Sequence, residues 1–370
     1  MRAWQFYGFG DMRLEEVSEP ELRDGHVLVE VLCVQPSVTE AQLAFGVPTL
    51  AYDEIKRRLE TEAPVRLFGH EFCARVLESP PGSRFRPGAR VAARAKLPCG
   101  DCPLCNDGQA LACRAGPIIG FQLPGCFSER ALLPEIALVE VDDSISDCEG
   151  ACLQSLSDSL AAVDTAGIQI GESVAVFGQG SMGLECMQAV RTAGAGLVVT
   201  VDIRDEACHI SSELGADVAI NARTDDPLEA IRDLTGGQGA DVVFECAGGS
   251  PRQGLAGAST LEQAIGSVRS GGKLMVVSWF GQPLEIDVDG LRERSLRVLF
   301  PDISSYAHLE HTVRLVASGQ VRLGPMLTHG LYGIESVRDA FEITANKAKY
   351  GAINPAQVMM PSGEGYLKFD

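Results

Sequence analysis

From about residue 150 onward, short apolar runs alternate with helical runs, and this alternation restricts the possible folds more than any other feature. Strands are expected at 173–178, 197–202, 241–248 and 273–281, with helices between them. A chain that alternates in this way builds βαβ units, whose strands are parallel and whose helices cover the sheet. The second half of the chain is therefore predicted to form a doubly wound α/β domain.

The part of the chain before this alternation has a different pattern, with short segments between glycines and prolines. Segments 26–34, 71–79 and 87–93 read as short half-buried strands. Residues 52–62 lack glycine and proline, so a short helix is expected there. With 370 residues, the chain exceeds what one hydrophobic core usually serves. We therefore expect a β-rich first domain, a barrel with excursions, in addition to the α/β domain.

The composition excludes several classes of function. Thirty-one basic and fifty acidic residues give a formal net charge of −19, and no basic run is present, which argues against nucleic-acid binding. The chain begins without a basic segment followed by an apolar one, so no secretory signal is expected. No uncharged apolar stretch reaches the roughly 20 residues that a membrane span needs. We therefore expect a cytoplasmic protein whose partners include neither nucleic acid nor a membrane.

A glycine-rich loop follows the first strand of the predicted α/β domain. The run from Gly178 to Gly183 (GQGSMG) matches the G-x-G-x-x-G pattern of dinucleotide-binding units. Gly178 would permit a tight turn, Gly180 would let a pyrophosphate approach the backbone, and Gly183 would let the helix pack closely on the strand. The N-terminus of that helix offers unpaired N–H groups to the phosphates. The loop therefore predicts a site for a nicotinamide dinucleotide.

The end of the next strand bears on the choice between the two nicotinamide cofactors. Asp202 lies 19 residues beyond Gly183, where a carboxylate can accept the ribose hydroxyls of NAD and would repel the 2′-phosphate of NADP. Arg204 lies nearby, and an arginine can receive that phosphate. On balance the sequence favours NAD(H) over NADP(H).

Four of the twelve cysteines are crowded into one short segment. Cys99, Cys102, Cys105 and Cys113 stand in CGDCPLCNDGQALAC, with two-residue gaps between the first three. Such spacing lets thiolates converge on one tetrahedral zinc ion, and four protein ligands leave no open coordination position. The alternatives are two disulfides, an iron–sulfur cluster or four unrelated thiols. We predict one structural zinc ion here.

The β-rich first domain, the four cysteines, the Gly69-His70-Glu71 motif and the glycine loop occur in a characteristic order. With them the chain resembles the zinc-containing medium-chain dehydrogenase/reductases, the superfamily of alcohol, polyol and threonine dehydrogenases, over nearly its whole length. The resemblance implies a GroES-like catalytic domain over 1–152, completed by 303–370, and a Rossmann domain over 153–302. It also implies a homodimer or homotetramer joined partly through the Rossmann sheets.

The resemblance places a catalytic site in which two of the three usual zinc ligands are missing. Ser37 stands where the family has a cysteine, and Gln154 stands where it has cysteine, aspartate or glutamate. His70 is retained beside Glu71, and Thr39 keeps the hydroxyl that relays protons. Hydroxyl and amide oxygens are poor zinc ligands. We therefore expect a catalytic zinc to be absent or weakly held, with His70 either a ligand or a hydrogen-bonded residue lining the site.

Further site residues follow from the same resemblance. Glu40 replaces the family's aspartate, and Asp158, one helical turn after Gln154, either holds a proton near the nicotinamide or is an exposed turn residue. The predicted catalytic residues are Ser37, Thr39, His70, Glu71 and Asp158. The predicted cofactor-binding residues are Gly178, Gly180, Ser181, Met182, Gly183, Asp202, Arg204, Ala247, Val277 and Trp279.

Three functions are consistent with these residues. The first is a nicotinamide-dependent oxidoreductase that interconverts a polar secondary alcohol and a ketone. The second is a zinc-independent reductase of an activated C=C or C=N bond, which the incomplete ligand set favours. The third is a nucleotide-binding protein without redox turnover. The identity of the small-molecule substrate does not follow from the sequence.

Overall fold

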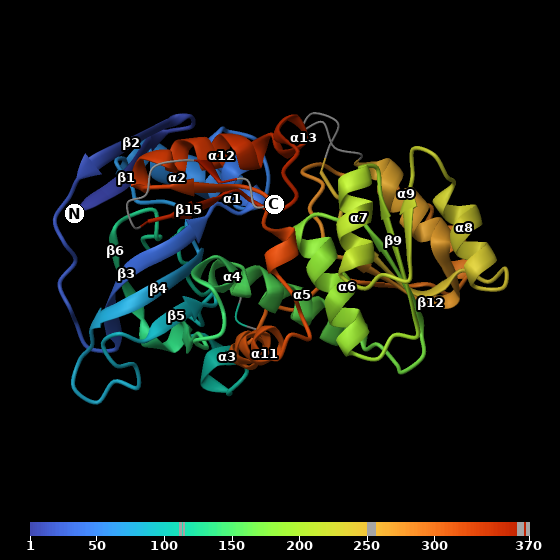
Figure 1. Ribbon diagram of the computed structural model, residues 1–370, viewed down its shortest axis with the longest axis horizontal. Coiled ribbons are helices and arrows are strands. Elements are labelled where there is room, and N and C mark those ends of the chain that lie inside the picture. The colour runs from blue at the N-terminus through green and yellow to red at the C-terminus, as the bar shows by residue number, and fades with distance from the viewer. Residues whose placement is uncertain (111–112, 114, 250–256, 361–365, 368–370) are drawn as a thin grey trace. The chain divides into compact units, whose positions relative to one another are not determined.

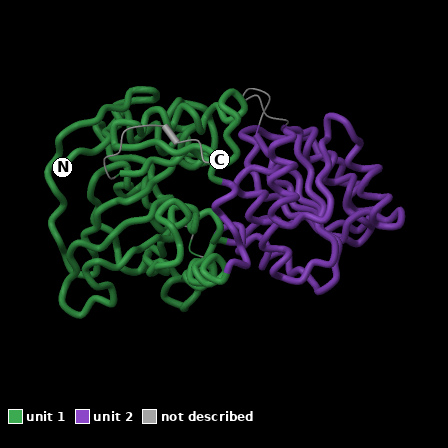
Figure 2. Tube along the Cα trace, in the orientation of Figure 1, with its two compact units in different colours: residues 1–157, 303–318, 327–370 green, residues 158–302, 319–326 purple. Residues whose placement is uncertain are grey.

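The chain folds into two compact units (Figure 2). The computed structural model describes residues 1–110, 113, 115–249, 257–360 and 366–367. Unit 1 comprises residues 1–157, 303–318 and 327–370, and unit 2 comprises residues 158–302 and 319–326. These ranges differ from the predicted domains at 153–157, which lie in unit 1, and at 319–326, which lie in unit 2.

Unit 1 is built around a largely antiparallel sheet with the strand order β16-β14-β15-β3-β4-β5-β7, and β6 also pairs with β3. The strands are β3 (His26–Gln35), β4 (Glu71–Glu78), β5 (Arg90–Ala93), β6 (Arg130–Pro134), β7 (Leu138–Glu140), β14 (Gly330–Tyr332), β15 (Gln357–Met359) and β16 (Tyr366–Leu367). β15 pairs antiparallel with β3, with Val358 opposite Val34. The C-terminal strands therefore complete a sheet that the first 150 residues begin.

A two-stranded sheet and several helices surround this sheet. β1 (Arg2–Gly8) pairs with β2 (Asp11–Glu16). The helices of unit 1 are α1 (Val38–Ala44), α2 (Tyr52–Glu62), α3 (Pro103–Asn106), α4 (Asp147–Ala151), α11 (Tyr306–Ala317), α12 (Val337–Ala345) and α13 (Lys347–Tyr350). The predicted helix at 52–62 is confirmed as α2.

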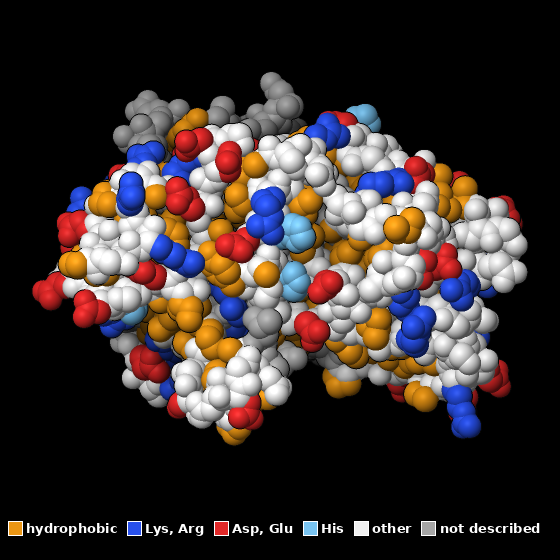
Figure 3. All heavy atoms as spheres, turned by 90° about the horizontal axis from the view of Figure 1, so that it is seen from below, with side chains coloured by type: hydrophobic (Ala, Val, Ile, Leu, Met, Phe, Trp, Pro, Cys, Tyr) orange, Lys and Arg blue, Asp and Glu red, His pale blue; other side chains and the backbone are white. Residues whose placement is uncertain are grey.

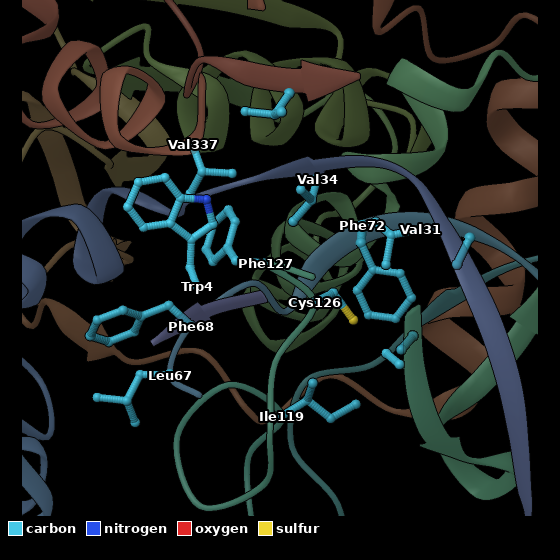
Figure 4. Close-up of a cluster of buried hydrophobic side chains, with 14 of the residues drawn as sticks. Trp4, Val31, Val34, Leu67, Phe68, Phe72, Ile119, Cys126, Phe127 and Val337 are labelled. Carbon is cyan, nitrogen blue, oxygen red and sulfur yellow. The ribbon is translucent and has the colours of Figure 1, made fainter. Parts of the chain in front are cut away.

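The core of unit 1 joins aromatic side chains from distant parts of the chain, several of which appear in Figure 4. Phe6 packs edge-on against Phe68, with ring centroids 5.0 Å apart, and Phe127 packs against Phe341 at 4.8 Å. Such pairs contribute about 0.5–1.5 kcal/mol each beyond the area they bury. Since Phe68 is fully buried two residues before His70, the loop that carries His70 starts from a fixed position.

Unit 2 contains a parallel sheet of six strands in the order β10-β9-β8-β11-β12-β13. The strands are β8 (Ser173–Phe177), β9 (Leu197–Asp202), β10 (Val218–Asn221), β11 (Ala240–Glu245), β12 (Val268–Val276) and β13 (Arg297–Leu299). The order reverses between β8 and β11, where doubly wound sheets bind their ligands. The predicted α/β class and the Rossmann-type sheet are confirmed.

Helices cover both faces of this sheet (Figure 1). The helices of unit 2 are α5 (Leu153–Ala166), which begins in unit 1, α6 (Ser181–Thr192), α7 (Asp205–Glu213), α8 (Pro227–Leu234), α9 (Ala258–Ser267) and α10 (Val288–Glu293). In the picture, α6 and α7 lie on one side of β9, and α8 and α9 on the other. No helix in the described ranges combines the length and the apolarity needed to cross a bilayer.

One predicted strand is wrongly placed. The sequence predicts a strand over 273–281, whereas β12 begins at Val268 and ends at Val276. It ends early because the next two backbone N–H groups, of Val277 and Ser278, both turn to the carbonyl oxygen of Glu245. Val277 and Trp279 therefore follow the strand instead of forming its end.

Candidate functional site

The hydroxyl of Ser37 caps the N-terminus of α1. Ser37 Oγ accepts the backbone N–H of Glu40 at 3.2 Å, and the Glu40 carboxylate accepts the backbone N–H of Ser37 at 3.0 Å. This reciprocal pair is a capping box, which satisfies two N–H groups at the start of a helix. The sequence signal for it, Ser-x-x-Glu at 37–40, was missed. Ser37 therefore serves as a helix cap at the position where the family has a zinc-binding cysteine.

Glu40 connects this cap to His70. Its side chain is fully buried, and Oε1 lies 2.5 Å from His70 Nδ1 while accepting the backbone N–H of Gly69 at 2.8 Å. Gly69 has φ +85°, and a Cβ there would lie 2.9 Å from the backbone nitrogen of Cys126, so only glycine fits this turn. The carboxylate thus orients the imidazole through Nδ1.

A buried amide chain holds Glu71 next to His70. Gln35 Nε2 donates to Glu71 Oε2 at 2.5 Å, and Gln357 Nε2 donates to Gln35 Oε1 at 2.8 Å. All three side chains are at least nine-tenths buried. Glu71 Oε1 lies 3.9 Å from His70 Nε2. Sequence reasoning missed Gln35 and Gln357, because only the pairing of β15 with β3 brings them together.

The donor set around His70 does not fit a catalytic zinc ion. Catalytic zinc takes three protein ligands in addition to water or substrate. His70 and Glu71 offer two, and the Ser37 hydroxyl is engaged as a cap. Gln154 on α5, which the family resemblance aligns with the third ligand, offers only a neutral amide. Within the described residues, three or more His, Cys, Asp or Glu donors come within 4.8 Å of one another only at the cysteine cluster.

The remaining predicted catalytic residues lie in different units. Thr39 is half-buried in the first turn of α1, between the two members of the capping box. Asp158 lies within α5 in unit 2 and is half-buried, so it is a helical residue and not an exposed turn residue. The structure joins Ser37, Glu40, His70 and Glu71 into one connected set. The catalytic roles of Thr39 and Asp158 stay predictions.

The four cysteines of the predicted zinc site do come together. Their sulfur atoms all lie within 4.8 Å of one another, with 3.8 Å between Cys99 and Cys105 and between Cys102 and Cys113. Zinc–sulfur bonds of about 2.3 Å in a tetrahedron require sulfur separations of about 3.8 Å. The backbone N–H of Cys99 donates to the Cys113 sulfur and lowers the pKa of that thiol to about 6. The four residues fit a structural zinc ion.

The glycine loop of unit 2 has the geometry of a dinucleotide site. Gly178 has φ +86°, and a Cβ there would lie 2.7 Å from the backbone of Ala247 on the neighbouring strand end. A Cβ on Gly183 would lie 1.7 Å from the carbonyl oxygen of Gly178. Helix α6 begins at Ser181, with Gly180 as its N-cap, and Met182 is half-buried in its first turn. The side-chain-free backbone and the half-buried start of this helix fit a pyrophosphate.

Asp202 ends β9 beside this loop and forms an ion pair with Arg204. Its oxygens accept the backbone N–H of Gln179 at 2.7 Å and the Nε–H of Arg204 at 3.1 Å. Burial alone would raise the pKa of Asp202, but the hydrogen bonds and charge of Arg204 and the N–H of Gln179 outweigh it and lower the pKa. Asp202 is therefore a buried carboxylate whose charge Arg204 compensates.

Glu245, at the end of β11, is a second buried acid that sequence reasoning missed. Its Oε1 accepts the backbone N–H groups of Ala247 at 3.0 Å and Gly248 at 2.8 Å, and its Oε2 accepts the hydroxyl of Ser278. Burial raises the pKa of Glu245. Trp279 is 59% exposed, and its carbonyl accepts the N–H of Gly249. Glu245 therefore shapes the backbone that contacts Gly178. Its position as an acidic residue within a buried strand was the available signal.

Comparisons with known proteins agree with this geometry. The family model described as an alcohol dehydrogenase GroES-like domain matches residues 23–143, and the one described as a zinc-binding dehydrogenase matches residues 181–318. Together they cover more than half of the chain. The chain belongs to the zinc-type medium-chain dehydrogenase/reductase family. This member is therefore a dehydrogenase or reductase.

Individual relatives of this family member extend over almost its whole length. The erythritol/L-threitol dehydrogenase of Mycolicibacterium smegmatis is 29% identical over 337 residues, which cover 89% of this chain and 90% of that protein. The L-threonine 3-dehydrogenase of Pyrococcus horikoshii is 29% identical over 347 residues, covering 91% and 92%. A zinc-binding dehydrogenase structure from Sinorhizobium meliloti, bound to NADP, is 28% identical with a TM-score of 0.83, covering 97% and 98%.

Proposed function

We propose that this family member interconverts a polar secondary alcohol and its ketone, with the Glu40–His70 pair doing the work of the missing catalytic zinc. The similar erythritol/L-threitol and L-threonine dehydrogenases have names that describe small, polar, hydroxyl-bearing substrates. The contact of 2.5 Å between the buried Glu40 carboxylate and His70 Nδ1 carries the proposal. The same arrangement of carboxylate and imidazole orients the general base of other enzymes.

The chemistry requires that a hydride leave carbon and a proton leave oxygen. The nicotinamide, when bound, accepts the hydride in oxidation and supplies it in reduction. A His70 ring that donates Nδ1–H to Glu40 has Nε2 as its acceptor, and Nε2 can take the hydroxyl proton. In the reverse direction the protonated ring donates from Nε2 to the carbonyl oxygen, while Glu40 stabilises its positive charge. We assign Thr39 a role in relaying that proton, as the family resemblance implies.

Reduction of an activated C=C or C=N bond is a second candidate that the donor set favours. A ketone without a Lewis acid depends on hydrogen bonds to polarise its oxygen, whereas an enone or an iminium ion is electrophilic already. His70 would then donate the proton that accompanies hydride transfer. A substrate panel that contains both classes separates the two functions.

The test combines a zinc count with that panel. Protein purified without chelator is expected to contain one zinc ion per chain, and Cys105→Ser is expected to remove it. Vicinal polyols, β-hydroxy amino acids, enones and cyclic imines are then assayed with NAD(H) and NADP(H), with and without a small zinc chelator that spares the structural ion. Turnover of an alcohol that the chelator does not inhibit supports the main proposal, and turnover of enones or imines alone supports the second. Two zinc ions per chain with chelator-sensitive turnover would contradict a zinc-free site.

We further propose that NAD(H) is the preferred cofactor. The charge of Arg204 is already compensated by Asp202, so a 2′-phosphate would have to compete with that carboxylate. Asp202→Asn frees Arg204 and is expected to raise kcat/KM for NADP(H), whereas Arg204→Ala leaves an uncompensated carboxylate and is expected to lower it. If Arg204→Ala improves the use of NADP(H), the pair does not set the preference.

We also propose a homodimer in which a second copy pairs along β13. This strand is one edge of the unit 2 sheet, and Phe300, which directly follows it, is 67% exposed. Two-fold symmetry would place the two β13 edges antiparallel, which satisfies their backbone groups. Phe300→Glu is expected to give monomers in light scattering, while Ile170→Glu, also on an exposed residue of unit 2, is not. A monomeric unmodified protein would contradict the pairing.

Nucleic acid and membranes are not among the proposed partners. The net charge of −19 opposes phosphate binding, and on the face shown in Figure 3 acidic and basic side chains are interspersed. The proposed ligands are therefore a nicotinamide dinucleotide and a small polar molecule.

A further inference from the structure

Two cysteines outside the zinc cluster lie in direct contact in unit 1. Cys33 and Cys148 are 115 positions apart in the chain, yet their sulfur atoms lie 3.9 Å apart, with the Cys33 thiol donating to Cys148. Neither is placed in the proposed acid–base chemistry. Eight cysteines lie outside the zinc cluster, and most of them have the burial of small packing residues. Cys148 is partly buried, so the pair joins one thiol that solvent can reach to one that is fully enclosed.

The elements that carry the two cysteines are packed tightly against each other. Cys33 lies in β3 opposite Cys73 of β4, and α4, which carries Cys148, packs on both strands. A Cβ on Gly150 of α4 would lie 2.8 Å from the Cys73 sulfur, so glycine lets this helix approach the sheet closely. Gln357 Nε2 also donates to the backbone carbonyl of Cys148 at 2.8 Å. The two sulfurs are therefore held near each other by the fold.

The two thiols differ in reactivity. The hydrogen bond from Cys33 lowers the pKa of Cys148, although burial and the neighbouring Asp147 and Glu149 oppose this. The same hydrogen bond and complete burial raise the pKa of Cys33. Because the thiolate is the nucleophile in disulfide exchange, the partly exposed Cys148 reacts first and the buried Cys33 second.

We propose that Cys33 and Cys148 form a reversible disulfide by exchange with a low-molecular-weight disulfide. The Cys148 thiolate attacks one sulfur of the small disulfide, which forms a mixed disulfide and releases one small thiolate. Cys33 then gives up its proton and attacks the Cys148 sulfur, which forms the Cys33–Cys148 bond and releases the second small thiolate. The two cysteines lose two electrons and two protons in total, and the small disulfide is reduced to two thiols.

The neighbouring cysteines are held by other contacts. Cys73 Sγ lies 3.9 Å from an oxygen of Asp147, and burial raises the pKa of Cys73 to about 12. Cys152 Sγ lies 3.6 Å from the amide oxygen of Gln35 and 3.4 Å from Gln357 Nε2. The Cys33–Cys148 link is therefore the product expected from this group of four.

Oxidation would reach the proposed acid–base pair through the amide chain. Closing the sulfur separation from 3.9 Å to about 2.05 Å draws α4 toward β3. Gln357 bonds both the Cys148 carbonyl and Gln35, and Gln35 holds Glu71 beside His70. Misplacement of a catalytic group by about 1 Å can cost on the order of 10²-fold in rate. Turnover is therefore expected to fall on oxidation and to return on reduction.

The cross-link can be mapped without any substrate. Cleavage after glutamate puts the four cysteines on four different peptides, 31–40, 72–78, 141–149 and 150–172. Reduced, zinc-loaded full-length protein is treated with oxidised glutathione, its remaining thiols are blocked, and the digest is analysed by mass spectrometry. The expected product links peptide 31–40 to peptide 141–149 and disappears on treatment with dithiothreitol, while a dye that reports zinc release shows none.

Several results would overturn this proposal. No modification, a glutathione adduct on 141–149 that never resolves, or a link through 72–78 or 150–172 would each do so. Cys33→Ser and Cys148→Ser should abolish the link, and Cys73→Ser and Cys152→Ser should retain it. The effect on turnover rests on the proposed function, whereas the linked peptides do not. Unchanged turnover in fully linked protein would overturn the coupling to Glu71 and leave the disulfide itself established.

Discussion

The glycine loop of unit 2 and the His70 region of unit 1 have departed from their family pattern to very different extents. The loop retains all three glycines, and at Gly183 even a single added carbon would lie 1.7 Å from a backbone oxygen. Around His70 the turn at Gly69 also requires glycine, but Ser37 and Gln154 stand where the family resemblance expects metal donors. A site made from backbone tolerates no side chain, whereas a site made from side chains can change its chemistry on an unchanged backbone.

The largest expected effect tests whether the His70 region is catalytic. His70→Ala is expected to lower kcat by on the order of 10²–10⁴-fold, because it removes the acid–base group. Glu40→Gln should lower kcat as well, since it removes the charge that orients the ring. Both variants should bind NADH normally, because the loop lies in the other unit. His26→Ala changes a half-buried histidine at the start of β3 in unit 1 and is the control. Full rates in both variants would refute the assignment.

Gly183→Ala tests whether the glycine loop of unit 2 tolerates a side chain. The added methyl group collides with the Gly178 carbonyl, so the loop must open, and NADH affinity measured by fluorescence should fall on the order of 10²-fold, or about 2.7 kcal/mol. Gly215→Ala is the matched control, because it introduces strain at φ +106° without meeting any atom. It should lower thermal stability and leave NADH binding unchanged. Equal effects of the two variants on binding would show that strain alone is responsible.

The double variant Ser37→Cys with Gln154→Glu tests whether zinc binding at His70 can be restored. Restoring the two donors that the family resemblance places in the zinc site with His70 is expected to raise the zinc content from one ion to two per chain. Loss of the serine cap should cost about 1 kcal/mol of stability. Ser146→Cys removes the equivalent capping box of α4 and is the control, with the same stability cost and no second zinc. A zinc content that stays at one ion per chain would mean that the backbone around His70, and not only its donor side chains, differs from the family's zinc site.

The smallest expected effect concerns Glu245. Burial raises its pKa above the ordinary value of 4.5, so the folded protein binds this proton more tightly than the unfolded chain does. Its contribution to stability is therefore greatest below pH 4.5 and is lost as pH rises through the folded pKa. Glu245→Gln cannot ionise, so urea unfolding should show its stability relative to the parent increasing across that window. Parallel stability curves would show that the carboxyl is not perturbed by burial.

The fold was largely predictable, and the reason is local. The runs at 173–178 and 197–202 and the helix at 52–62 carry their own periodicity, so β8, β9 and α2 appear close to where the sequence predicts them. The misplaced end of β12 depends on a carbonyl of β11, which is a contact that no local pattern contains. The motifs predicted the glycine loop and the cysteine cluster for the same local reason.

The site at His70 was only partly predictable. The motif that contains His70 and the loss of two zinc donors can be read from the residues in order. Gln357 reaches Gln35 because β15 pairs with β3, and this pairing joins residues 322 positions apart. The contact between Cys33 and Cys148 likewise exists only because α4 packs on β3. Pairings of this kind depend on long-range packing, which sequence spacing does not encode.

The sequence by itself determined the two kinds of domain, the dinucleotide loop, the cysteine cluster and the absence of two catalytic zinc ligands. Each of these depends on residues close together in the chain, whose spacing and size limit the local backbone or the available donors. Only the tertiary structure decided what replaced the zinc ligands: a serine that caps α1, a buried glutamate that orients His70, and an amide chain that holds Glu71. The physical reason is that the role of a buried polar side chain is set by the partner that satisfies it, and folding brings that partner from elsewhere in the chain.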